Sequence, residues 1–490
     1  MIALLVRLYG LSSDPVWFDE AATIEIANLP LADLFGEMAR LESNPPGYYL
    51  IAKAWIFFFG EDISGLRVLS AIAGTLTLVP VWYFTRATFG ERAGFLVAGL
   101  TAVASTLVRF SQEARSYALL FFIFCCAMVV ALRLVRAPSR VRAVVLPVLV
   151  LGLLQGILVW LHATAAIQIL ALGCFVIAAC FASSGELGRG LAMIAASGVV
   201  TLLVGLPPVA NVVQHLFQPE FSDRWIDRPD VLEALRIYGR TLVAPFQYGL
   251  SPVGGVLAAG LVGLAAVAGF RRRDGVTIGL AATLAFIGVF LPLLANVVPV
   301  LLDRTVLFLW MPLNVLVAAG AVRLPGRAVY VVSLALIALQ TVGLFNWYRL
   351  DPRKEQWPAA ARLLMALGPG EPILATEGAF AARALAIALR EQRGSARIVA
   401  VPPTAEMERF VAAKGERESI LDPATLCTSV SGASAVWVVT RHLSPRVASD
   451  AGYSSKAPVV SALRAARSTL ISTTTVPGID VEKWSAPHCP

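Results

Sequence analysis

The chain has 490 residues, of which 57% are hydrophobic and only 15% are charged. Soluble domains carry roughly 45–50% apolar and about 25% charged residues, so the composition excludes an ordinary soluble protein and indicates an integral membrane protein. The net charge of +8 does not indicate nucleic-acid binding, because the arginines fall in small clusters between apolar runs.

The first apolar stretch is MIALLVRLYGL, residues 1–11. It is too short for a bilayer core that requires about 20 helical residues. It also lacks a small-residue cleavage site, so we interpret it as an anchor and not as a cleaved signal. We expect either an unusually short helix or a start of the chain that lies upstream of Met1, and we favour the second.

Longer apolar runs follow along the chain, each at or near the length of a membrane span. They lie at residues 66–85, 93–110, 116–135, 143–161, 163–182, 190–209, 252–270, 276–298, 305–322 and 328–346. Together with the first segment, they predict about eleven transmembrane helices.

The arginines predict the orientation of these helices in a cell membrane, either inner or plasma membrane. With the N-terminus in the cytoplasm, every loop that falls inside carries arginine, as the positive-inside rule requires. These loops are 86–92, 133–142, 183–189, 271–275 and 323–327. This orientation holds only if residues 45–60, PPGYYLIAKAWIFFFG, do not cross the membrane. Because this stretch is short and contains Pro45, Pro46 and Lys53, we expect an interfacial or re-entrant helix there.

The composition changes after residue 346, and residues 347–490 are expected to form a separate extracytoplasmic domain. EPILATEG and SAVWVVTRH are typical of short buried strands, and AFAARALAIALREQRG is typical of an amphipathic helix that ends at glycine. Alternating strands and helices indicate a small α/β domain.

Polar residues gather on the predicted outer side, where their cost near lipid needs an explanation. The first outer loop, 12–65, contains VWFDEAATIE with Asp19 and Glu20, and the next contains RFSQEARSY. His162 lies near the outer end of a helix, several charged residues lie at 211–230, and PVLLDRTV contains Asp303 and Arg304.

Each of these polar groups also has a purely structural interpretation. The acidic pair suits a first helical turn, arginines can reach lipid phosphates, a histidine can be a core residue, and Asp303 can pair with Arg304. Their convergence on one face favours an anion site beside a catalytic base.

Several segments in order resemble a known superfamily. DEAATIEIA, NPPGYYL, FGEDISGLRVLSAIAG, YFTRATFG and FSQEARSYALL follow one another over roughly residues 10–135. This series resembles GT-C superfamily glycosyltransferases, and is similar to the polyprenyl-phosphate-mannose protein mannosyltransferases (family 39-like) and lipid A aminoarabinose transferases. The resemblance implies a GT-C-like domain over 1–346. It also implies transfer of a sugar, hexosyl or pentosyl, from a polyprenyl-phosphate carrier to an extracytoplasmic lipid, glycan or protein acceptor.

The resemblance also suggests roles for individual residues. It places catalytic carboxylates at Asp19, Glu20 and Glu113, and the carrier phosphate at Arg115 and Arg304, with Lys53 as a secondary candidate. Asn44, Tyr117 and His162 would line the site. Relatives often carry histidine or a Glu-Lys pair before the double proline, where this chain has Ser43 and Asn44. The need for a divalent metal therefore stays open.

Two other classes of function fit a multi-pass chain with outer charges. A lipid-carrier transporter would also gather cations, but transporters often show internal repeats and charged helix interiors, which this sequence lacks. A non-catalytic scaffold is the third class, and the acidic and basic motif residues argue against it. The favoured chemistry is a single inverting displacement, with Asp19 as the base for a hydroxyl or amine acceptor.

Overall fold

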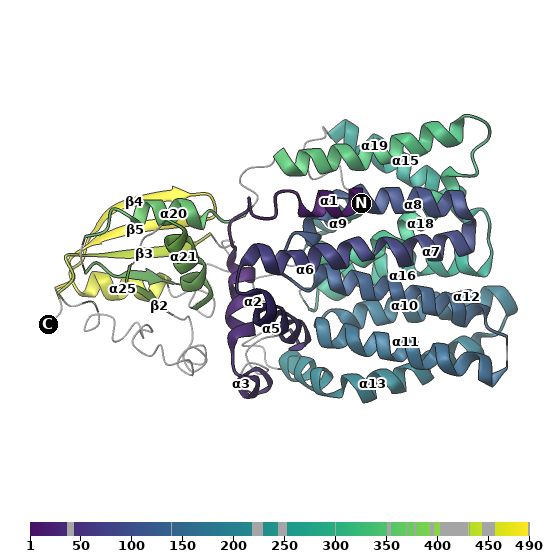
Figure 1. Cartoon of the computed structure of the whole chain (residues 1–490), viewed down its shortest axis with the longest axis horizontal. Coiled ribbons are helices and arrows are strands. Elements are labelled where there is room, and N and C mark those ends of the chain that lie inside the picture. Colours follow the sequence, from purple (N-terminus) through teal and green to yellow (C-terminus); the bar gives the residue numbers. More distant parts are fainter. Residues whose placement is uncertain are drawn as a thin grey trace.

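The computed structural model shows a bundle of helices with a small sheet domain at one end (Figure 1). The chain is thus an α-helical polytopic membrane protein with a C-terminal α/β domain, as the sequence predicted. The structure describes residues 1–36, 44–138, 140–217, 229–243, 252–298, 300–349, 354–368, 370–376, 379–392, 396–401, 430, 432–442 and 456–488.

Eight helical segments among the described residues are long and apolar enough to cross a membrane, and a ninth forms if one bent pair counts as a span. The eight are α6–α7 (Ile63–Leu76 and Leu78–Phe89), α10 (Tyr117–Arg136), α11 (Val141–Leu161), α12 (Ala165–Ser184), α13 (Leu187–Phe217), α16 (Gly275–Ala295), α17–α18 (Asp303–Val306 and Trp310–Ala321, joined by η2, Leu307–Leu309) and α19 (Ala328–Arg349). The predicted count of about eleven is not confirmed. The predicted runs are helical; α1 (Ile2–Leu8) is too short to cross a membrane, and α15 (Pro252–Phe270) covers the run expected at 252–270.

The bent pair replaces the straight span expected at 93–110. Helices α8 (Glu91–Val103) and α9 (Ser105–Ser111) meet at 55°. A break in lipid is tolerated only where the freed carbonyls find donors. The fully buried Arg7 of α1 supplies them: it donates to the carbonyls of Thr101 and Ala102 and to Ser111 Oγ, at 3.0 to 3.2 Å. The short first helix therefore stabilises the break.

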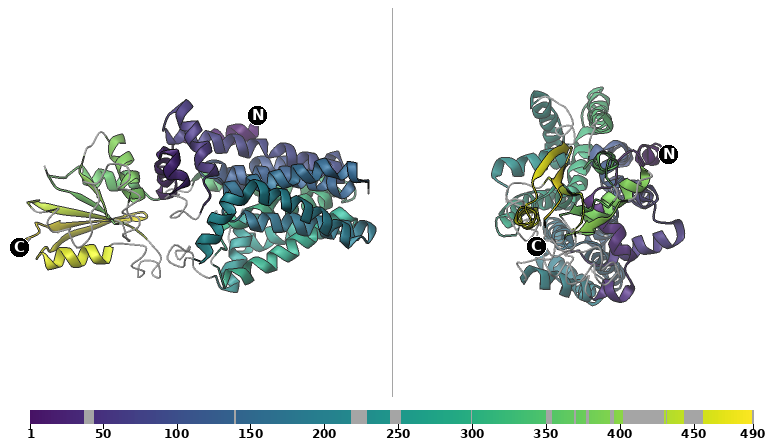
Figure 2. Two further views of the ribbon diagram at one scale, coloured as in Figure 1. Left: turned by 90° about the horizontal axis from the view of Figure 1, so that it is seen from below. Right: turned by 90° about the vertical axis from the view of Figure 1, so that its left-hand side faces the viewer.

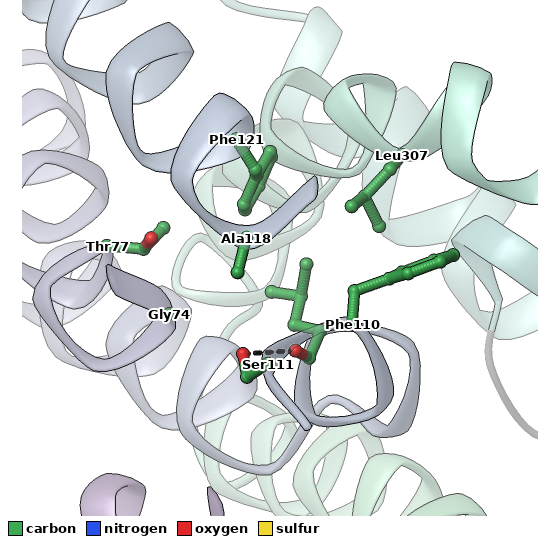
Figure 3. Close-up of a pocket in the computed structure, with 8 residues that line it drawn as sticks. Gly74, Thr77, Phe110, Ser111, Ala118, Phe121 and Leu307 are labelled. Carbon is green, nitrogen blue, oxygen red and sulfur yellow. Dashed lines mark hydrogen bonds between the residues drawn. The ribbon is translucent and has the colours of Figure 1, made fainter. Parts of the chain in front are cut away.

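A small cavity lies beside this break (Figure 3). It is lined by Gly74, Thr77, Leu107, Phe110, Ser111, Ala118, Phe121 and Leu307. Its volume of about 10 Å³ is room for roughly one water molecule. On Gly74 a Cβ would lie 2.0 Å from Ser111 Oγ, so α6 and α9 pack too closely for any larger residue. The cavity is a packing feature of the break and has no room for a substrate.

The basic loops meet at the end of the bundle away from the sheet domain (Figures 1 and 2). Arg136 donates to the carbonyl of Ala87, Arg189 to that of Ala137, and Arg323 to that of Gly269. Arginines of three different loops thus bind carbonyls at neighbouring helix ends. Such an end is what the positive-inside rule expects of a cytoplasmic face, and the orientation itself stays a prediction.

Three short helices lie at the opposite end of the bundle, next to the sheet domain (Figure 1). They are α2 (Phe18–Asn28), α3 (Leu31–Phe35) and α5 (Gly47–Phe59). The 13 residues of α5 reach about 20 Å, less than the bilayer core of about 30 Å, which agrees with the expected non-spanning helix. A Cβ on Gly47 would lie 2.4 Å from the carbonyl oxygen of Trp160, so glycine lets α5 begin against the end of α11.

The C-terminal domain is a five-stranded sheet of order β2-β1-β3-β5-β4. Its strands are β1 (Ile373–Ala375), β2 (Ile398–Ala400), β3 (Ala435–Arg441), β4 (Leu470–Val476) and β5 (Ile479–Ser485). Strands β2, β1 and β3 are parallel, and β3, β5 and β4 are antiparallel. Helices α20 (Trp357–Leu364) and α21 (Ala379–Glu391) pack on one face, and α25 (Lys456–Ala465) packs on the other. The predicted strands in EPILATEG and SAVWVVTRH and the helix between them are confirmed.

Candidate functional site

The acidic pair lies in the first turn of α2, but its two carboxylates meet different surroundings. The side chain of Glu20 is fully buried, whereas 22% of the Asp19 side chain is exposed. Only Asp19 can therefore reach a substrate without a rearrangement of the helix.

Glu20 is surrounded by partners that use both of its oxygens. Arg67 donates to Oε1 at 2.9 Å and to Oε2 at 2.6 Å, and the backbone N–H of Ala114 donates to Oε1 at 2.9 Å. Lys354 Nζ lies 3.5 Å from Oε1. Burial alone would raise the pKa of Glu20, but Lys354 and Arg67 lower it well below its usual range. The sequence grouped Glu20 with the catalytic carboxylates; its geometry favours a structural ion pair.

Arg67 also orders the segment that precedes α2. Its guanidinium donates to the carbonyls of Leu11, Asp14 and Pro15 at 2.6 to 3.0 Å. A guanidinium has five N–H donors, and here they satisfy a carboxylate and three carbonyls at once. This buried arginine on α6 therefore fixes both Glu20, the neighbour of Asp19, and the segment that leads into α2.

Two arginines approach Asp19 from the bundle. Arg304 Nη1 lies 3.6 Å from Asp19 Oδ2. Arg115 donates to the Asp19 carbonyl at 3.1 Å and to Thr23 Oγ1 at 3.2 Å. Both guanidinium groups lie near the ring of Tyr117, at 5.9 Å for Arg115 and 5.5 Å for Arg304. The sequence-predicted Asp19, Arg115, Arg304 and Tyr117 are thus brought together.

His162 borders the same cluster. Its ring centroid lies 5.6 Å from that of Tyr117, and its Nδ1 contacts the N–H and hydroxyl of Thr164. Burial, and then the nearby Arg304 and Arg115, lower the pKa of His162 to about 3. The imidazole is therefore neutral at physiological pH and adds no charge to the anion site.

Glu113 lies in a neighbouring ion-pair network. It is 4% exposed, and its Oε1 lies 3.6 Å from Arg109 Nε. Arg109 also contacts Asp303 Oδ2 at 3.2 Å, and Arg240 of α14 (Val231–Leu242) contacts Asp303 Oδ1 at 2.6 Å. The simple interpretation of a local Asp303–Arg304 pair is wrong, because these neighbours bind different partners.

The remaining predicted residues lie apart from this cluster or at its margin. The ammonium of Lys53 donates to the carbonyls of Ala27 and Leu29 at 3.1 and 2.8 Å, where it stabilises the C-terminal end of α2. Asn44 is partly buried at the bend before the double proline. Residues 37–43 and 218–228, with most of the charges expected at 211–230, lie outside the described residues.

A metal ion in a protein of this kind would need several His, Cys, Asp or Glu ligands close together. Within the described part of the chain, no group of three or more His, Cys, Asp or Glu side chains comes close enough to hold a metal ion. The partly exposed carboxylate of Asp19 instead pairs with Arg304, and Arg115 donates to the backbone carbonyl of Asp19; both positive charges disfavour a cation there. The described residues therefore do not fit a metal site.

Sequence comparison alone identifies no relative: no family model and no curated protein matches the chain. Solved structures do match. The apo form of ArnT from Cupriavidus metallidurans aligns over 98% of this chain and 96% of its own, with a TM-score of 0.65 and 14% identity. The same protein bound to undecaprenyl phosphate gives a TM-score of 0.63 at 14% identity, with the same coverage. The Archaeoglobus fulgidus oligosaccharyltransferase in complex with Zn and sulfate gives 0.51 at 14% identity, over 90% of this chain and 67% of that one.

These matches define a class of fold. The chain has the GT-C fold of membrane glycosyltransferases, as its N-terminal motifs predicted. Within that class, the similarity to ArnT extends over the bundle and the C-terminal domain together.

Proposed function

We propose that the chain is a membrane glycosyltransferase that moves a sugar from a polyprenyl-phosphate carrier to an acceptor on the side of the C-terminal domain. The observation that carries this is the cluster of one partly exposed carboxylate, Asp19, with two arginines, Arg115 and Arg304. A base beside an anion site is what this reaction requires. A fold shared with ArnT, which binds undecaprenyl phosphate, supports the choice of carrier.

Asp19 is the general base of the proposed reaction. An acceptor hydroxyl or amine attacks the anomeric carbon of the sugar, and its proton passes to the Asp19 carboxylate. The new bond forms from the acceptor atom to the anomeric carbon, while the bond from that carbon to the phosphate oxygen breaks. One displacement inverts the anomeric configuration.

Arg115 and Arg304 stabilise the leaving group. The donor is a phosphodiester with one negative charge, and the released polyprenyl phosphate is a monoester with up to two. Asp19 with two arginines carries a net charge of +1, so the cluster matches the donor and attracts the product more strongly. Charge that develops in the transition state is therefore stabilised, because the arginines are fixed in place and partly buried.

The ion pair between Arg304 and Asp19 links the two roles. In the structure these two groups form an ion pair, with Arg304 Nη1 3.6 Å from Asp19 Oδ2. A donor phosphate competes for Arg304 and releases the carboxylate to accept a proton. We therefore expect Asp19 to become available as a base only when a carrier phosphate is bound, which would disfavour reaction with water in the empty site.

A transporter remains the alternative function, and no described contact favours it. The charged side chains that gather near Asp19 lie at helix ends beside the C-terminal domain, not along a path through the bundle. We propose that this end faces the extracytoplasmic space, with the N-terminus in the cytoplasm. We further propose that residues 1–346 carry out transfer.

The test is mass spectrometry of lipid-linked sugars and envelope glycans in cells with and without the protein. A glycosyltransferase leaves an accumulated carrier sugar and a missing modification when it is deleted, and these name both substrates. Complementation with Asp19→Asn should fail, while Asp33→Asn, an acidic residue on α3 outside the cluster, should restore the modification. Equal lipid-linked sugars in both cells would contradict the proposal.

A further inference from the structure

Helix α2, which carries Asp19, lies between the bundle and the C-terminal domain (Figure 2). We propose that Glu355 and Arg383 are positioning residues, through which the C-terminal domain anchors α2 at two points and aligns Asp19 with Arg304. This inference rests on the proposed function, in which Asp19 is the base. It assigns the C-terminal domain a part in the chemistry, although none of its residues touches the reacting atoms.

The first anchor is at the N-terminus of α2. Trp17, the residue before the helix, provides no side-chain cap. Glu355 provides one from far along the chain: its Oε2 accepts the backbone N–H of Phe18 at 3.1 Å and the indole N–H of Trp357 at 2.8 Å. A carboxylate is stabilising here, because the first N–H groups are unpaired and the helix dipole is positive at this end.

The cap is itself fixed by the sheet. Arg441, at the end of β3, pairs with Glu355 Oε1 at 3.2 Å. Its guanidinium also lies 3.9 Å from the centroid of the Phe18 ring. The first residue of α2 is therefore bound through both its backbone and its side chain, and both contacts lead to the C-terminal domain.

The second anchor is at Glu25, about two turns further along α2. Arg383 on α21 binds Glu25 Oε1 through Nε at 3.0 Å, and binds Glu61 Oε2 through Nη2 at 2.8 Å. The ring of Phe380, also on α21, contacts that of Phe18 at 5.7 Å in a T-shaped pair. One arginine thus links the domain both to α2 and to the start of the bundle.

The apolar core extends across the same boundary. Val16 and Ala21 are buried within the C-terminal domain's own cluster, together with Trp357, Ala381 and Ala384. One face of α2 is therefore part of the core of the C-terminal domain, while its other face carries the contacts to Arg115 and Arg304.

The consequence falls on Asp19. Its neighbour Phe18 is bound by Glu355, and its neighbour Glu20 lies 3.5 Å from the ammonium of Lys354. Asp19 therefore lies between two residues that contact the C-terminal domain, and these contacts add to those that Arg67 of the bundle makes with Glu20. Catalytic geometry is sensitive to shifts of about 1 Å, so loss of the anchors should slow the chemical step and leave donor binding, which uses bundle arginines, unchanged.

The experiment uses the full-length protein with Glu355→Ala, Glu355→Gln, Arg383→Ala and a control, Arg464→Ala, on the exposed side of α25. We expect Glu355→Ala and Arg383→Ala to lower kcat by roughly tenfold to a hundredfold with an unchanged KM for the donor. Glu355→Gln keeps an acceptor for the Phe18 N–H and should recover part of the rate. A merely structural role would not produce this split between kcat and KM or this recovery.

A second measurement does not depend on activity. Hydrogen–deuterium exchange over residues 18–28 should be faster in Glu355→Ala and Arg383→Ala than in the wild type, and unchanged in Arg464→Ala. Unchanged exchange overturns the anchors, and faster exchange with wild-type kcat overturns their part in alignment. A wild type that binds undecaprenyl phosphate but shows no transfer to any acceptor overturns the proposed function, whatever the exchange result, so the two failures are distinguishable.

Discussion

The guanidinium of Arg304 lies 3.6 Å from the carboxylate of Asp19, and this ion pair joins α17 of the bundle to α2 beside the C-terminal domain. Arg115 donates a hydrogen bond to the backbone carbonyl of Asp19. The carboxylate and the anion-binding groups are therefore one electrostatic unit, and replacing either member should change a different step of the proposed reaction.

Replacing the base should remove the chemistry and leave binding. Asp19→Asn keeps the size of the side chain but cannot accept a proton, so we expect kcat to fall by about 10²-fold to 10⁴-fold. The measurement is transfer by the purified protein under single-turnover conditions, beside Asp33→Asn as the control. Donor affinity should not weaken, because the amide no longer competes for Arg304. Near-normal turnover would show that Asp19 is not the base.

Replacing the cation should weaken binding of the carrier. Arg304→Ala removes a charge-assisted contact worth about 1.5–3 kcal/mol, so undecaprenyl phosphate should bind roughly tenfold to a hundredfold more weakly. Arg304→Lys should recover only part of the affinity, since an ammonium is not a bidentate ligand. Calorimetric titration measures both. Arg86→Ala, which removes the same charge at the other end of the bundle, is the control, and unchanged affinity in Arg304→Ala would remove its role.

The structure brings together four of the residues to which the motifs gave roles, and the roles themselves stay predictions. Asp19, Arg115, Arg304 and Tyr117 lie together as their motif positions implied. Glu20 was grouped with Asp19 because the two are adjacent, and only the fold shows that adjacent residues on a helix face different surroundings.

The residues that sequence reasoning missed act over long range. Arg67 and Lys354 neutralise Glu20 from segments far away in the chain. The sequence around a lysine does not show which distant carboxylate it will pair with. Similarly, Lys53, the secondary candidate for the carrier phosphate, binds the end of α2. The break in α8–α9 was missed because residues 99–108 contain no proline and no charged residue, and the donor that permits it, Arg7, lies on another helix.

Glu20 should matter for stability and not for proton transfer. Glu20→Gln leaves Arg67 and Lys354 buried without their counter-ion, which typically costs about 3–5 kcal/mol. We expect a lower Tm in detergent, while the protein that remains folded retains kcat. Arg464→Ala, an exposed charge in the C-terminal domain, should leave Tm unchanged. Wild-type stability with strongly reduced kcat would instead support the sequence-based grouping of Glu20 with the catalytic carboxylates.

The same ion pair predicts a pH dependence of stability. The pKa of Glu20 is lower in the folded protein than its ordinary value of 4.5, so the unfolded chain binds more protons as the pH falls. The stabilisation is therefore complete above about pH 4.5 and decreases as the pH falls toward the folded pKa of about 2. Thermal unfolding of wild type and Glu20→Gln between pH 7 and 3 measures this. The difference in Tm should shrink with acid, and a constant difference would contradict the ion-pair account.

Arg7 should be required for the broken span. Arg7→Met keeps an apolar stem but leaves the carbonyls of Thr101 and Ala102 without donors, and each unsatisfied buried group costs about 1–3 kcal/mol. We expect a clear loss of Tm, with smaller loss in Arg7→Lys, which keeps one donor group. Equal stability of Arg7→Met and wild type would show that the break does not depend on α1.

The orientation can be tested across the last helix of the bundle. Helix α19 has 22 residues and is long and apolar enough to cross a membrane, so its two ends should lie on opposite sides. The arginines at 323–327 precede it, and the positive-inside rule places them in the cytoplasm. A phosphatase reporter fused after residue 346 should therefore be active, and one inserted at 323–327 should be inactive. The reverse pattern would place Asp19 and the C-terminal domain in the cytoplasm, where the proposed acceptors are not found.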